Sequence, residues 1–128
     1  MKIIIFFGLV MIAGKVVSTD EFDLVMQKSK ECEEELGGPK DLINKMDKGE
    51  DVGDETKAGK MALCINGKLG HMNKKGENIP DKLKNHVNKL TEDKKLRKQV
   101  IEECGPKNGK TAPEAALNFV KCMVKNFK

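Results

Sequence analysis

Four cysteines limit the folds open to this chain of 128 residues more than any other feature of its sequence. They are Cys32, Cys64, Cys104 and Cys122, separated by 31, 39 and 17 residues. These gaps leave no CxxC pair to form half of a tetrahedral site, so a zinc site is not expected. An even number of cysteines in an oxidising compartment favours two disulfides, and spacing alone leaves all three pairings open.

The N-terminal segment indicates which compartment the chain enters. A lysine precedes an unbroken apolar run over residues 3–13, and residues 16–18 (VVS) fit a signal-peptidase site. A membrane anchor is the alternative, but the run ends at Lys15, short of the roughly 20 residues that a spanning helix needs. Residues 1–18 are therefore predicted to be a secretory signal peptide, and residues 19–128 a single soluble, exported domain.

Hydrophobic spacing predicts an all-α domain, because the segments between turns have helical rather than strand periodicity. Pro39 suits the first position of a short helix, Asp54 is a candidate N-cap, and residues 111–114 (TAPE) form a capping box. Residues 70–80, rich in Gly, Asn and Lys, are expected to be an exposed and mobile loop. The six expected helices cover about residues 20–36, 39–49, 55–69, 81–90, 96–104 and 111–127.

Catalytic signatures are missing from the sequence, which has no HExxH, no GxSxG and no phosphate-cradling glycine loop. His71 and His86 are the only histidines, and neither has an orienting partner or a nucleophile nearby in the sequence. We therefore predict that the protein is not an enzyme and has no catalytic residue, metal site or cofactor. A secreted hydrolase is the least favoured functional class.

Charge is distributed unevenly along the chain. Residues 19–55 carry a net charge of −8 and residues 56–128 a net charge of +10. The simplest interpretation is that the two parts attract each other or solvate helix faces, and a basic face for acidic lipid or nucleic acid is the alternative. Nucleic acid is disfavoured because Arg97 is the single arginine and no aromatic residues are interleaved with the lysines.

The cysteine spacing resembles that of the insect odorant-binding proteins of the pheromone and general odorant-binding superfamily. Members of that family usually have six cysteines, and here the first, third, fourth and sixth positions are filled by Cys32, Cys64, Cys104 and Cys122. The run CINGKLGHMNKKGENIPDKL also looks like the family's third helix, following loop and start of the fourth helix.

The two vacated cysteine positions are occupied by Lys60 and Pro113. In the family these two cysteines pair with each other, so their joint loss leaves no unpaired thiol. The sequence therefore resembles the four-cysteine members known as the Minus-C type.

The resemblance implies a compact bundle of about six helices around an apolar cavity, with bridges from Cys32 to Cys64 and from Cys104 to Cys122. It also implies a secreted carrier, monomeric or weakly dimeric, that binds small hydrophobic molecules such as odorants or pheromones reversibly and could deliver them to a membrane chemoreceptor. A saposin-like protein that interacts with lipid or disrupts membranes is the alternative, because it too is small, helical and disulfide-linked.

The residue pattern independently supplies candidates for the lining of such a cavity. We expect about half of them to contact ligand and the rest to be plain core. The methionines among them suit an adaptable pocket. The candidates are Met26, Leu42, Met46, Met61, Ile65, Leu69, Leu83, Val87, Val100, Phe119, Met123 and Phe127.

Two hypotheses concern ligand exchange. Without a bridge between positions 60 and 113, the third and sixth helices should fluctuate more in their separation and ease ligand entry. Protonation of His71 is the second candidate trigger, opening the pocket at acidic pH.

Overall fold

The computed structural model describes residues 10–12, 15–17 and 19–127. Two short antiparallel strands, β1 (Val10–Ile12) and β2 (Lys15–Val17), pair within the predicted signal peptide. The other leader residues and Lys128 lie outside the described residues, so the signal peptide stays a prediction.

Six α-helices build the rest of the chain, as the hydrophobic spacing predicts. No helix in the described part of the chain is both long and apolar enough to cross a membrane. The helices are α1 (Thr19–Leu36), α2 (Leu42–Asp47), α3 (Glu55–Leu69), α4 (Pro80–Leu90), α5 (Lys94–Cys104) and α6 (Ala112–Asn126).

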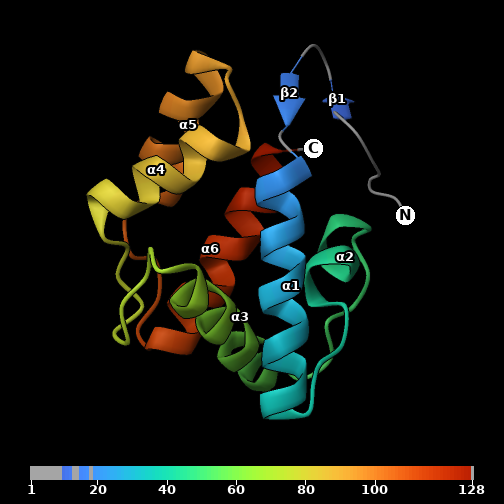
Figure 1. The fold of residues 1–128 in the computed structure, drawn as a ribbon. Coiled ribbons are helices and arrows are strands. Elements are labelled where there is room, and N and C mark those ends of the chain that lie inside the picture. Colours follow the sequence, from blue (N-terminus) through green and yellow to red (C-terminus); the bar gives the residue numbers. More distant parts are fainter. Residues whose placement is uncertain (1–9, 13–14, 18, 128) are drawn as a thin grey trace.

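Helix α3 is central to the packing, because it makes its largest contacts with α6 and α1 (Figure 1). Helices α4 and α5 pack against each other. They join the rest of the bundle where α4 meets α1 and α5 meets α6. Helix α2 lies along the outer side of α1 and also contacts α6. The bundle therefore surrounds one hydrophobic interior to which all six helices contribute.

The predicted caps are confirmed at the starts of α3 and α6. The Asp54 carboxylate accepts hydrogen bonds from the backbone N–H groups of Thr56 and Lys57, at 2.8 and 3.2 Å. The Thr111 hydroxyl accepts from the Glu114 N–H at 3.2 Å, and Glu114 in turn accepts from the backbone N–H preceding Thr111 at 2.8 Å. Such caps satisfy N–H groups that have no partner inside the helix.

The predicted start of the second helix is wrong by three residues. Helix α2 begins at Leu42 rather than at Pro39, which follows a cis peptide bond. Asp41 adopts a φ of 56°, a left-handed conformation that a right-handed helix cannot pass through. Helix α4, by contrast, begins at Pro80, one residue before the expected position and in the first-turn place that proline favours.

The prediction of a wholly exposed loop over residues 70–80 is also wrong in part. Lys74 and Lys75 are exposed, but His71 and Met72 are buried, with 1% and 4% of their surface accessible. The loop folds back on itself through a bridge between Met72 and Asn78. Polar composition therefore misses two inward-pointing side chains that the folded loop covers.

Both expected disulfides are confirmed. Cys32–Cys64 joins α1 to α3 with the Cα atoms 6.0 Å apart, and Cys104–Cys122 joins α5 to α6 with the Cα atoms 5.6 Å apart. These bridges lie within two separate helix pairs and so leave the contact between α3 and α6 without a covalent link.

A glycine allows α3 and α6 to approach each other closely near the two vacated cysteine positions. Lys60 is exposed, while the adjacent Gly59 is buried against Pro113. A Cβ atom at position 59 would lie 2.7 Å from the Pro113 carbonyl oxygen, closer than real Cβ contacts allow. The two helices therefore meet backbone to backbone at this point.

Candidate functional site

The hydrophobic interior contains all the residues predicted to line a cavity. Met26, Leu69 and Phe127 are partly buried and pack against it. The other nine are buried, namely Leu42, Met46, Met61, Ile65, Leu83, Val87, Val100, Phe119 and Met123. The structure thus confirms that they share one core, whereas their contact with a ligand stays a prediction.

A cluster of three buried polar residues and one half-buried polar residue interrupts this apolar interior. We call Glu21, His71, Asn78 and His86 the histidine cluster. Glu21 lies in the first turn of α1, His86 lies on the inward face of α4, and the other two belong to the loop between α3 and α4. No pattern in the sequence predicts this cluster, because its members come from three separate segments of the chain.

Glu21 and His86 form the first half of the histidine cluster. The Nδ1 atom of His86 lies 2.5 Å from the Glu21 carboxylate, and both side chains are at most a tenth exposed. A carboxylate can only accept, so His86 donates this hydrogen bond. The pair ties the start of α1 to α4 across the end of the bundle.

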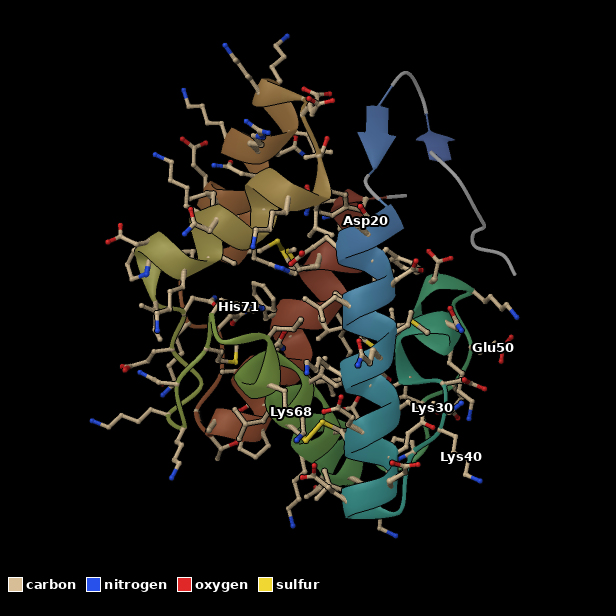
Figure 2. The ribbon with its side chains drawn as sticks, viewed as in Figure 1. Asp20, Lys30, Lys40, Glu50, Lys68 and His71 are labelled. Atoms are coloured by element: carbon tan, nitrogen blue, oxygen red, sulfur yellow. A yellow bond between two sulfur atoms is a disulfide. The ribbon has the colours of Figure 1, made fainter. Side chains whose placement is uncertain are left out.

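His71 forms the second half of the cluster. Its ring stacks on that of His86 with centroids 4.7 Å apart and planes inclined by 20°. Phe119 of α6 packs against the same ring at a centroid distance of 5.2 Å. Figure 2 shows His71 where the connection between α3 and α4 passes close to α6. The loop therefore places an imidazole against a predicted lining residue.

Asn78 fixes the protonation pattern of His71. The Asn78 Nδ2 donates to the Gly105 carbonyl oxygen at 3.0 Å, so its Oδ1 is left to accept from His71 Nδ1 at 3.2 Å. The proton of the neutral ring accordingly sits on Nδ1, and Nε2 carries a lone pair.

Burial controls the charge of both histidines. Desolvation lowers the pKa of His71 to about 4, and the neighbouring His86 lowers it as well. Burial also lowers the pKa of His86, and the hydrogen bond that His86 donates to Glu21 opposes that shift. His71 is therefore neutral at pH 7.

Two buried side-chain atoms in the described residues lack any hydrogen-bond partner, the hydroxyl oxygen of Ser29 and Nε2 of His71. Ser29 lies on the inward face of α1, two turns beyond Glu21. Buried polar atoms are normally paired, so these two atoms are available to a further hydrogen-bond partner.

A separate groove of about 380 Å³ opens on the surface between the end of α2 and α6. Met46, Val52 and Val124 supply its apolar lining, and charged side chains border it. Of the predicted cavity residues only Met46 reaches it, so this groove lies apart from the histidine cluster.

Metal-binding geometry is not found at the histidine cluster or elsewhere in the described residues, where no group of three His, Cys, Asp or Glu side chains could hold an ion. The site combines a large apolar surface with a few buried polar atoms, an arrangement typical of ligand pockets.

Comparison with known proteins finds proteins similar to this chain in sequence and in fold. Over 118 residues the chain is 27% identical to the B1 protein of Tenebrio molitor, covering 92% of this chain and 89% of that protein. It is equally similar to the B2 protein of the same beetle, covering 91% of it. An odorant-binding protein of Drosophila melanogaster has the same fold, with a TM-score of 0.64 at 14% identity over 84% of this chain and 93% of the other.

A match to a family model establishes which family the chain belongs to. Residues 17–126, which include all six helices and both disulfides, match the model of the PBP/GOBP family of pheromone-binding and general odorant-binding proteins. Four cysteines in two bridges, with none left free, fit the Minus-C type. The chain therefore belongs to the PBP/GOBP family.

Proposed function

We propose that this protein is a secreted carrier that shelters a small hydrophobic molecule in the interior of its helical bundle and releases it unchanged. The observation that carries the proposal is the methionine-rich interior of a PBP/GOBP bundle. Of the five methionines that follow the predicted signal peptide, Met46, Met61, Met72 and Met123 belong to the hydrophobic core, and Met26 packs against it. Unbranched, polarisable side chains can rearrange around guests of several shapes.

Hydrophobic burial supplies most of the binding free energy that this function needs. Removing roughly 300 Å² of apolar ligand surface from water contributes about 7 kcal/mol, before the entropy cost of binding. Micromolar affinity corresponds to about 8 kcal/mol, so one or two polar contacts added to the hydrophobic burial are sufficient for it. A carrier of this kind needs no catalytic residue or cofactor. It would work as a monomer or weak homodimer and could hand its ligand to a membrane chemoreceptor.

Displacement of an environment-sensitive naphthylamine dye tests the proposal, since the chain has no tryptophan to quench. We expect small apolar molecules to displace the dye from the oxidised protein at micromolar concentrations. Native mass spectrometry should detect the same molecules retained one per chain. Leakage of anionic vesicles without retention of any ligand would contradict the carrier and favour the saposin-like alternative.

A matched pair of variants tests whether the ligand lies in the interior. Met61→Ala removes a fully buried side chain of α3, while Leu36→Ala trims a side chain that is 48% exposed at the end of α1. We expect Met61→Ala to shift the preference toward longer ligands and Leu36→Ala to leave it unchanged. Equal ligand preferences in the two variants would place the binding site outside the interior.

A further inference from the structure

The Nε2 atom of His71 is buried and has no hydrogen-bond partner. It is one of two orphaned buried side-chain atoms in the described structure, and the His71 side chain is 1% exposed. Bulk solvent therefore does not contact this atom, and a hydrogen-bond donor to it has to be a group held inside the protein.

Three contacts hold the His71 ring so that Nε2 stays available. Asn78 occupies Nδ1, His86 covers one face of the ring, and Phe119 packs against it at an inclination of 46°. Rotating the ring to hide Nε2 would break the hydrogen bond to Asn78 and leave the Asn78 amide oxygen unpaired. Asn78 is itself anchored to the end of α5 through the Gly105 carbonyl. The lone pair is thus held on the ring nitrogen that does not bind Asn78.

The surroundings of this lone pair select the chemistry of its partner. A neutral imidazole nitrogen without a proton can only accept, which excludes ethers, ketones and hydrocarbons as partners. An ionised carboxylate is excluded as well, because it has no proton to donate. An ammonium group would lose too much hydration in an apolar core. An uncharged hydroxyl is the donor with the smallest desolvation cost.

We propose that His71 Nε2 accepts a hydrogen bond from the hydroxyl group of a bound apolar alcohol, so that the carrier prefers alcohols to ethers and hydrocarbons of equal size. This inference deepens the proposed function and depends on it. The low pKa of His71 agrees with it, because the ring stays an acceptor at neutral pH.

The test compares three ligands of equal size by dye displacement: nonan-1-ol, its isomer 1-methoxyoctane, and decane. We expect the alcohol to bind the wild-type protein between about threefold and tenfold more tightly than the ether, the range of one neutral hydrogen bond. Equal affinity for alcohol and ether would overturn the alcohol preference while leaving the carrier intact. Failure of all three ligands to displace the dye would instead contradict the carrier itself.

Two substitutions at position 71 separate the two ring nitrogens. His71→Asn keeps a donor near the place of Nδ1 and removes the acceptor at Nε2, so the preference for the alcohol should disappear. His71→Gln carries an amide oxygen near the place of Nε2 and should restore part of it. An unchanged preference in His71→Asn would overturn the proposal.

Ser29→Ala is the matched control, because it removes the other orphaned buried atom. We expect this variant to keep the ratio of alcohol to ether affinity. Loss of the ratio in Ser29→Ala, together with its survival in His71→Asn, would assign the hydroxyl contact to Ser29 and overturn the role of His71.

A measurement on the wild-type protein covers the case in which the position 71 variants fail to fold. The ¹⁵N resonance of His71 Nε2 reports directly whether that atom accepts a hydrogen bond. We expect it to shift when nonan-1-ol is added and to stay in place with 1-methoxyoctane. A resonance that already indicates a hydrogen bond in the free protein, and is unaffected by the alcohol, would identify a buried water as the partner and overturn the proposal.

Discussion

The imidazole rings of His71 and His86 stack face to face with 4.7 Å between their centroids, although one belongs to a loop and the other to α4. Beyond His86 lies the Glu21 carboxylate, and Lys89 adds a positive charge that further lowers the pKa of His86. A positive charge on either ring therefore lies close to the other ring. The loop, α1 and α4 are coupled through the protonation of these two groups.

Acid should weaken the folded state through His71. Its folded pKa of about 4 lies below the ordinary value of 6.5, so the unfolded chain binds the proton more readily. The stabilisation is complete above pH 6.5 and is lost as the pH falls to about 4, by an amount on the order of 3 kcal/mol. Urea unfolding at several pH values should show this loss, and His71→Gln should reduce the slope. Parallel pH profiles for the two proteins would contradict the prediction.

Ligand release is expected to follow the same titration. Protonated His71 cannot keep its buried position among His86, Asn78 and Phe119 at low cost, so acid should open the pocket. Bound dye should leave the wild-type protein between pH 6.5 and 4. In His71→Ala the release curve should be flatter, and an identical curve would exclude His71 as the trigger.

Glu21 should stabilise the bundle through its buried hydrogen bond to His86. Glu21→Gln keeps the shape and removes the charge, and we expect it to cost about 1–2 kcal/mol of unfolding free energy. Because Glu21 raises the pKa of His86, the variant should lower that pKa further, as followed by NMR titration. Asp23→Asn changes an exposed acid two residues away and should alter neither quantity. An unshifted His86 titration in Glu21→Gln would show that the pair is not formed in solution.

Two glycines of α3 offer opposite expectations for the same substitution. Gly59→Ala would press a Cβ atom against the Pro113 backbone, so we expect a loss of about 1–3 kcal/mol. Gly67→Ala has no atom within 4 Å of the new Cβ atom and should gain up to about 1 kcal/mol from helix propensity. Thermal melts of the two variants measure both effects. Similar melting temperatures would argue against the close approach of α3 and α6.

Restoring the absent bridge tests whether movement between α3 and α6 controls ligand exchange. In Lys60→Cys/Pro113→Cys, formation of the third disulfide is first verified by mass spectrometry. Dye release from the bridged protein should be slower than from the same variant with that bridge reduced. Equal release rates after confirmed bridge formation would place the entry route elsewhere.

Local signals predicted much of this fold. The capping box at Thr111 and the N-cap Asp54 mark the starts of α6 and α3 because cap hydrogen bonds are made within four residues. The cysteine spacing indicated the pairing through the family resemblance, and the structure has the same two bridges. The start of α2 was missed because the left-handed conformation of Asp41 has no periodic signature.

The histidine cluster could not be predicted in the same way. His71 and His86 are 15 positions apart in the sequence, and Phe119 and Glu21 are farther still. Their contacts depend on how the loop folds over the bundle, and two adjacent buried residues in a polar loop leave no periodic pattern. The apolar candidates were easier, because burial on one helix face repeats every three or four residues.

The two disulfides share no helix: one links α1 with α3, and the other links α5 with α6. The covalent framework is thus divided into two halves along the seam where Gly59 meets Pro113. Widening that seam would break non-covalent contacts alone and leave every covalent bond of the chain in place. We therefore expect a guest to pass between the halves in an oxidising medium, and the same bundle to close again behind it.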